Sequence, residues 1–129
     1  MNTKLVMTLS AAFLALLGLG LTFLPQEISS YLSLGDGAAI HLVLQLLGAL
    51  YLGFAMLNWM AKGSLLGGIY NRPIAVANFT HFFVGALALI KGNPGTALPT
   101  LVVVGLYSVF ALVFGIILYR HPLKAEAGA

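Results

Sequence analysis

The sequence has 129 residues, of which nine are charged: six Lys or Arg and three Asp or Glu. Hydrophobic residues make up 60% of the chain and charged residues 7%, against roughly 45–50% and about 25% in soluble proteins. This composition excludes a soluble globular domain, whose surface needs more charge, and a disordered chain. The formal net charge of +3 reflects scarce acids, and no basic run could follow a phosphate backbone, which excludes nucleic acid as a partner. The composition indicates one integral membrane domain over residues 1–129, with the lipid bilayer as its surroundings.

Four segments are long and apolar enough to cross a membrane, since a helix needs roughly 20 apolar residues to cross hydrocarbon about 30 Å thick. They cover residues 5–24, about 38–61, 73–90 and about 98–119. The first segment is longer than the apolar part of a signal peptide, typically about 7–15 residues, and no cleavage site of small residues follows it. The sequence therefore predicts an all-α, integral membrane four-helix bundle with a short cytoplasmic tail over residues 120–129.

The basic residues predict how these spans are oriented. If the spans alternate in direction, five of the six Lys and Arg residues lie on one side and only Lys91 lies on the other. Cytoplasmic loops of membrane proteins carry the excess of basic residues. We therefore expect a multi-pass protein of the bacterial inner (cytoplasmic) membrane with both termini in the cytoplasm. The residues on the cytoplasmic side are Lys4, Lys62, Arg72, Arg120 and Lys124.

The longest outer connection, residues 26–37, allows two interpretations. Ile28, Tyr31 and Leu32 recur at helical spacing and favour a short helix that lies in the membrane interface. Alternatively, the segment is an ordinary polar loop in which Asp36 caps the following helix.

Small residues indicate which helix faces pack together, because helices in lipid associate through close packing and interhelical hydrogen bonds. Each span carries small residues along one side, and we expect them at helix contacts. They are Ala11, Ala15, Gly18 and Thr22 in the first span, Gly48 and Ala55 in the second, Gly85 and Ala88 in the third, and Ser108, Ala111 and Gly115 in the fourth.

Polar side chains in the second and third spans are the main candidates for a site, because polar groups at membrane depth are costly and usually face a bundle's interior. At 100° per residue, His41 and Gln45 share one face of the second span, and Asn78 and His81 lie within roughly 80° of each other on the third. His81 lies about 12 Å from the cytoplasmic end, near the bilayer centre. If the two faces meet, the polar side chains form a column through the bundle. Its members are His41, Gln45, His81, Asn78 and Asn58.

Each of these side chains also has a structural interpretation. The deep Gln, Asn and His side chains could form interhelical hydrogen bonds worth about 0.6 to 2 kcal/mol. His41 lies near the outer interface, where water could solvate it. Trp59 and Tyr70 occupy positions typical of interfacial aromatic anchors.

The segment before the third span, residues 67–73 (GGIYNRP), is the most distinctive stretch. Asn71 can cap the helix that Pro73 starts. Arg72, together with the positive end of the helix dipole, could capture an anionic headgroup or a carboxylate; alternatively, it is a positive anchor at a helix start. With this segment included, the candidate ligand-binding residues are His81, Asn78, Gln45, His41, Asn58, Arg72, Asn71, Tyr70 and Trp59.

Other kinds of chemistry find little support in the sequence. His41 and His81 differ in depth by more than about 10 Å, too much to hold one haem between them. The spans contain no carboxylate and the chain contains no cysteine, which leaves no metal site and no group to orient a histidine for catalysis. We therefore expect a non-enzymatic protein without catalytic or metal-binding residues, and the sequence identifies no cofactor.

The chain has a long first outer loop and a Gly-rich, Arg-containing segment, residues 67–73, before its third span. In these features, in its size and in its predicted topology it resembles the DoxX-like group of small bacterial four-helix membrane proteins. The resemblance covers nearly the whole chain in layout and implies the same fold. Some members of that group are associated with membrane redox systems, but the resemblance implies no catalytic residues here.

Two functions are consistent with these residues. The first is a non-enzymatic membrane protein that binds a small amphipathic or lipid-like ligand, or that serves as an accessory subunit of a larger membrane system. His81, Asn78 and Gln45 would line the polar part of its cavity, and Arg72 would lie at the cytoplasmic mouth. The alternative is a small oligomeric transporter or channel that uses the polar column as its path. The sequence identifies neither the ligand, nor a partner protein, nor the oligomeric state.

Overall fold

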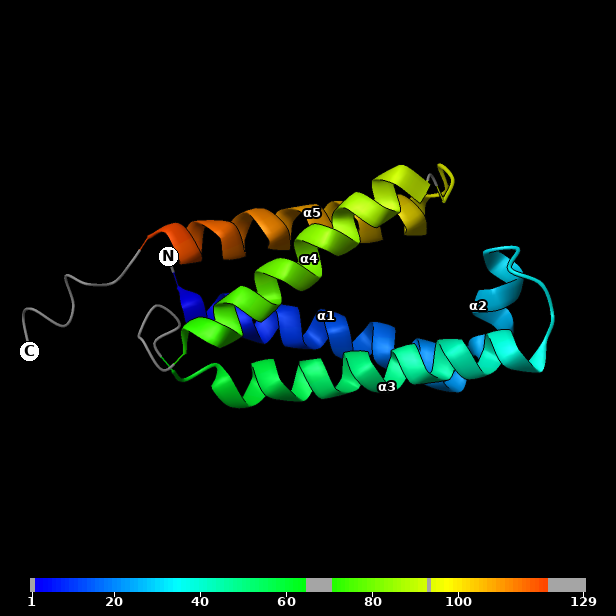
Figure 1. The fold of residues 1–129 in the computed structure, drawn as a ribbon, viewed down its shortest axis with the longest axis horizontal. Helices are drawn as coiled ribbons and strands as arrows, with labels where there is room; N and C mark the ends of the chain where they lie inside the picture. Colours follow the sequence, from blue (N-terminus) through cyan, green and yellow to red (C-terminus); the bar gives the residue numbers. More distant parts are fainter. Residues whose placement is uncertain (1, 65–70, 93, 121–129) are drawn as a thin grey trace, which may run out of the picture. The chain divides into compact units, whose positions relative to one another are not determined.

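The computed structural model describes residues 2–64, 71–92 and 94–120, and its regular secondary structure over these residues is α-helical (Figure 1). The chain divides into two compact units, Met1–Gly63 and Ser64–Ala129. The first unit contains α1 (Thr3–Phe23), α2 (Pro25–Tyr31) and α3 (Ala38–Ala61), and the second contains α4 (Arg72–Gly92) and α5 (Leu98–Tyr119).

Four of these helices, α1, α3, α4 and α5, have the length and apolar composition needed to cross a membrane. The prediction of four apolar spans is therefore confirmed, and α3 and α5 have the predicted bounds. The first helix begins before residue 5 because the Asn2 side chain caps it: its Oδ1 accepts a hydrogen bond from the Leu5 amide at 3.1 Å. It ends before Pro25, which disfavours helical geometry in the residue that precedes it.

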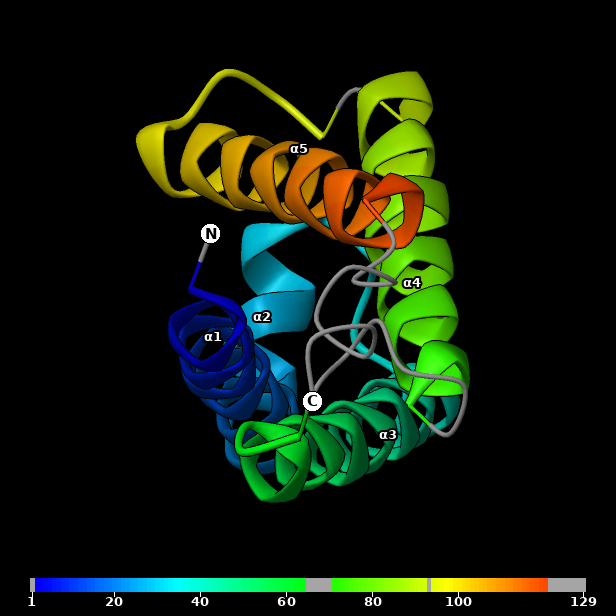
Figure 2. The same cartoon turned by 90° about the vertical axis from the view of Figure 1, so that its left-hand side faces the viewer.

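The first unit is built on α1 and α3, which lie side by side and run in opposite directions (Figures 1 and 2). Their backbones approach most closely at Gly18 and Gly48. A Cβ atom on Gly48 would lie 2.8 Å from the Gly18 carbonyl oxygen and 2.9 Å from the Thr22 amide nitrogen. Because no real Cβ tolerates such distances, glycine is required here, and the predicted role of these two small residues is confirmed.

The buried residues of α1 and α3 recur mostly every three or four positions, as the contact between two helices requires. The predicted small residues Ala15 and Thr22 are only half-buried, because larger side chains share the contact with Gly18. On α1 the buried residues are Met7, Ser10, Ala11, Leu14, Gly18 and Leu21, and on α3 they are Leu44, Gly48, Ala55, Asn58 and Ala61.

The connection between these two helices contains α2, which confirms a short helix in this segment. The chain then turns through Ser33 and Gly35, whose φ angles are 55° and 94°. The buried Ser29 hydroxyl donates a hydrogen bond to the Gly35 carbonyl and so closes the turn. The expectation that Asp36 caps the following helix is wrong, because the N-cap of α3 is Gly37 and no side chain bonds to the cap.

In the second unit, α4 and α5 cross at an angle rather than lying parallel (Figures 1 and 2). The Tyr107 ring packs onto Gly85, where a Cβ atom would come within 2.7 Å of the ring's Cδ1. The predicted contact role of Gly85 is therefore confirmed, whereas Ala88 is exposed and lies outside the contact.

Aromatic rings fill most of the contact between α4 and α5. Phe82 is fully buried, and its ring centroid lies 4.8 Å from that of Phe110 and 5.8 Å from that of Phe114, both in stacked geometry. Tyr107 meets the same ring edge-on at 5.3 Å. Such aromatic pairs add stabilisation beyond simple contact area, so this helix pair is held mainly by ring packing over one glycine.

The close approach of α1 and α3 gives a direct test of this fold. Gly48→Ala should lower the free energy of unfolding by about 1–3 kcal/mol, because its methyl group would press against the backbone of α1. The matched control is Gly53→Ala on the same helix, where nothing lies within 4 Å of the added Cβ. It should leave stability unchanged or raise it by up to about 1 kcal/mol. Thermal unfolding in one detergent compares the variants, and equal midpoints would contradict the contact.

Candidate functional site

The residues predicted to form a site are found in both units. Those on α3 in the first unit are His41, Gln45, Asn58 and Trp59. Those in the second unit are Asn71, Arg72, Asn78 and His81. Tyr70 lies outside the described residues. The column, which requires the second and third spans to face each other, stays a prediction.

Asn58 forms an interhelical hydrogen bond in the first unit. It is fully buried, and its Nδ2 donates to the hydroxyl oxygen of Ser10 on α1 at 3.0 Å. The Ser10 hydroxyl in turn donates to the Met7 carbonyl at 3.0 Å. Sequence reasoning singled out Asn58 but missed Ser10, although a hydroxyl on the small-residue side of the first span is the signal that could have found it. This contact joins α1 to α3 inside a closed interface.

Gln45 occupies a more open position than the sequence predicted. Its side chain is exposed, and its Nε2 lies 3.5 Å from the backbone carbonyl oxygen of Thr22, a long hydrogen bond. Thr22 belongs to the last turn of α1, where backbone carbonyls lack partners within the helix. Gln45 therefore reaches across to the end of α1.

His41 lies at the start of α3 and pairs with the connection rather than with deeper groups. Its Nε2 lies 3.3 Å from Oδ1 of Asp36, and the two side chains are 17% and 91% exposed. The distance fits an ion pair when the imidazole is protonated, but the contact does not meet the angles of a hydrogen bond. His41 thus ties the first turn of α3 to the acidic residue that precedes it.

Trp59 lies near the other end of α3 and is half exposed. The Nζ atom of Lys62 lies 3.0 Å from the centroid of its ring, which is a cation–π contact. An exposed aromatic ring beside a lysine at a helix end is typical of an interfacial anchor.

The second unit places a polar pair between α4 and α5. Nε2 of His81 lies 3.2 Å from the hydroxyl oxygen of Tyr107, and the two rings are 5.4 Å apart. The hydroxyl donates when Nε2 is unprotonated and accepts when Nε2 carries the hydrogen. Tyr107 is buried and His81 is half-buried. Sequence reasoning missed Tyr107; its signal is a phenol in the middle of an apolar span, where the hydroxyl needs a partner.

Asn78 and the start of α4 lie on the same helix as His81. Asn78 is fully buried, and its Nδ2 donates to the Ile74 carbonyl of its own helix at 3.0 Å. Asn71 precedes the helix, and its backbone carbonyl accepts the amides of Ile74 and Ala75 at 3.1 and 3.4 Å. Arg72 is the first residue of α4 and is exposed.

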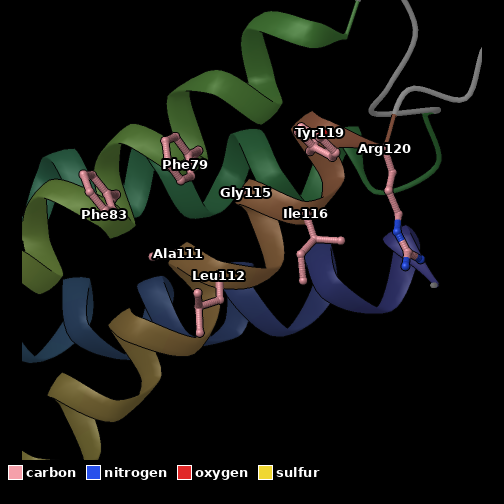
Figure 3. Close-up of a pocket in the computed structure, with 8 residues that line it drawn as sticks. All are labelled: Phe79, Phe83, Ala111, Leu112, Gly115, Ile116, Tyr119 and Arg120. Atoms are coloured by element: carbon pink, nitrogen blue, oxygen red, sulfur yellow. The ribbon is translucent and has the colours of Figure 1, made fainter.

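An open groove of about 540 Å³ lies on the second unit (Figure 3). Sequence reasoning did not predict it, because a groove depends on how two helices cross rather than on the pattern of either one. Its lining is apolar except near the end of α5. The lining residues are Phe79, Phe83, Ala111, Leu112, Gly115, Ile116, Tyr119 and Arg120.

Among the residues that the structure describes, no three His, Asp or Glu side chains come together as a metal site requires. The arrangement offers hydrogen-bonding groups in apolar surroundings, together with one open groove. The chain matches no protein-family model, no curated protein and no solved structure. Its function is therefore inferred from the geometry of its own residues.

The contact between Asn58 and Ser10 can be measured directly. Ser10→Ala should lower the free energy of unfolding by about 1–2 kcal/mol, because a buried amide then loses one partner. A double-mutant cycle with Asn58→Ala should give a coupling energy of about 0.6–2 kcal/mol. The control cycle combines Thr8→Ala with Asn58→Ala, because the Thr8 hydroxyl bonds to the Lys4 carbonyl of its own helix. Equal coupling energies in the two cycles would show that the interhelical bond contributes nothing specific.

Proposed function

We propose that the chain is a multi-pass protein of the bacterial inner membrane that binds a small amphipathic or lipid-like ligand, alone or as an accessory subunit of a larger membrane system. Four helices are long and apolar enough to cross a membrane, which supports this location. The excess of basic residues in alternate loops supports an orientation with both termini in the cytoplasm. The resemblance in layout to the DoxX-like group favours a four-helix bundle in the same membrane.

The observation that carries the proposal is the pair formed by His81 and Tyr107. His81 lies about 14 Å along α4 from its first residue, close to the middle of a hydrocarbon layer about 30 Å thick. Polar groups at that depth are costly and mark functional sites more often than chance. Since His81 is only half-buried, its imidazole is a group that a ligand can reach.

The surroundings of this pair suit a ligand with a small polar part and a larger apolar part. The buried rings of Phe82 and Tyr107 lie 5.0 and 5.4 Å from the His81 ring and hold it in apolar surroundings. The half-buried imidazole is the polar group of this pair that a ligand could contact, and a polar group in apolar surroundings can orient a ligand. Asn78, three residues earlier on α4, would add an amide, and Arg72 would attract an anionic group at the membrane boundary.

The alternative function is a small oligomeric transporter or channel. It is favoured by polar contacts at more than one depth along the helices, including Gln45 with Thr22 and the His81 pair. Solute flux into proteoliposomes that disappears in His81→Ala would favour this alternative over binding alone.

Ligand binding predicts an adduct that depends on the polar pair. Native mass spectrometry of the purified wild-type protein should show a stoichiometric adduct, and its occupancy should fall in His81→Ala, Asn78→Ala and Tyr107→Phe. The matched control is Ser108→Ala, which also removes one hydroxyl from α5 but one that bonds to the Val104 carbonyl of its own helix. A mass without an adduct, or an adduct indifferent to all four substitutions, would overturn the proposal.

The predicted topology can be tested with single cysteines, since the natural chain contains none. Lys91→Cys should react with a membrane-impermeant maleimide in intact spheroplasts, because residue 91 lies on the outer side of the predicted topology. Lys4→Cys should react only after the membrane is opened. The reverse labelling pattern would contradict cytoplasmic termini.

A further inference from the structure

We propose that the groove on the second unit is a binding site for an anionic phospholipid, with its phosphate at Arg120 and one acyl chain lying along α5. This site is separate from the His81 pair. Phe79 and Phe83 each lie two residues from His81, which places the groove about 160° away from His81 around α4.

The two walls of the groove come from different helices. Leu112, Ile116 and Arg120 recur every four residues, so they share one side of α5, and Figure 3 shows their side chains following one another along it. The opposite wall is formed by Phe79 and Phe83 of α4, whose rings stack with centroids 5.3 Å apart and an interplanar angle of 16°. The groove therefore has apolar sides, and the side formed by the two Phe rings is flat.

The two walls meet at a glycine, where the Phe79 ring packs closely against α5. Gly115 has no side chain, and a Cβ atom there would already lie 3.2 Å from the Phe79 ring. The side chains along the groove remain accessible, with Leu112 69% and Ile116 44% exposed. An accessible apolar surface at membrane depth is the kind of surface that acyl chains cover.

The length of the groove matches one leaflet of a bilayer. From Ala111 to Arg120 the helix rises about 14 Å, which is close to half of a hydrocarbon layer about 30 Å thick. An acyl chain lying along α5 would therefore have its headgroup at the level of Arg120. The neighbouring Tyr119 is 92% exposed, as expected for an aromatic residue at the headgroup level.

Charge identifies the class of lipid. Among the described residues that line the groove, Arg120 is the charged one, and a guanidinium can donate two parallel hydrogen bonds to phosphate oxygens. A second copy of the chain fits less well as the occupant. Two of the chain's three acidic residues, Glu27 and Asp36, lie between α1 and α3, on the opposite side of the membrane if the spans alternate, where they could not neutralise Arg120.

The experiment compares lipid binding to the full chain in a non-ionic detergent by native mass spectrometry, with phosphatidylglycerol and phosphatidylcholine as probes. The wild-type protein should retain one phosphatidylglycerol in clear preference to phosphatidylcholine. Arg120→Gln should weaken phosphatidylglycerol binding roughly tenfold, as expected for the loss of a charge-assisted contact, and should leave phosphatidylcholine binding unchanged. Leu112→Trp, which keeps the charge but narrows the groove, should weaken the binding of both lipids.

The matched control is Lys91→Gln, which removes the same charge from the far end of α4 and should bind phosphatidylglycerol as the wild type does. Equal retention of the two lipids by the wild-type protein would overturn the inference. So would equal losses in Arg120→Gln and Lys91→Gln, or a dimer that forms in place of the lipid complex. Because His81→Ala should leave this binding intact, the outcome is independent of the ligand proposed for the His81 pair.

Discussion

Helices in a membrane gain little by exchanging contacts with lipid for contacts with each other, so they must be held by close packing and by polar contacts between them. Both helix pairs of this chain meet that requirement through a glycine. Gly18 and Gly48 let the backbones of α1 and α3 touch, whereas Gly85 makes room for the ring of Tyr107 between α4 and α5. Each pair adds an interhelical polar contact to its glycine contact.

The two polar contacts differ in how deeply their residues are buried. The hydrogen bond between Ser10 and Asn58 joins two fully buried residues and closes the interface of the first unit. The contact between His81 and Tyr107 leaves the imidazole half-buried, and an open groove runs along another face of the same helix pair. The second unit therefore carries both proposed binding sites, while α1 and α3 form a closed pair.

Much of the fold could be predicted from the sequence, because the length and hydropathy of a membrane span are local properties. Gly18 and Gly48 could also be identified as contact residues, since small residues on one side of a helix mark its packed face. Their partners could not, because such a pattern identifies a face but not the residue opposite: Ser10 and Tyr107 were missed for this reason. Gln45 was expected at depth on a packed face, but α1 ends close to it, so only the last turn of α1 lies within reach. The groove was unpredictable because it arises from the crossing of two helices.

The central claim is that these helices lie in a membrane and pack through one face. Nitroxide labels at single cysteines, placed one at a time over residues 50–61 of α3 in lipid vesicles, test both parts together. The account predicts that collisions with dissolved oxygen rise and fall with the helical period, with minima at Ala55 and Asn58 and a maximum at Met60, which is 77% exposed. It also predicts few collisions with a water-soluble nickel chelate at the labelled positions that lie deepest in the membrane. A uniform oxygen profile, or free access of the chelate throughout, would contradict the account.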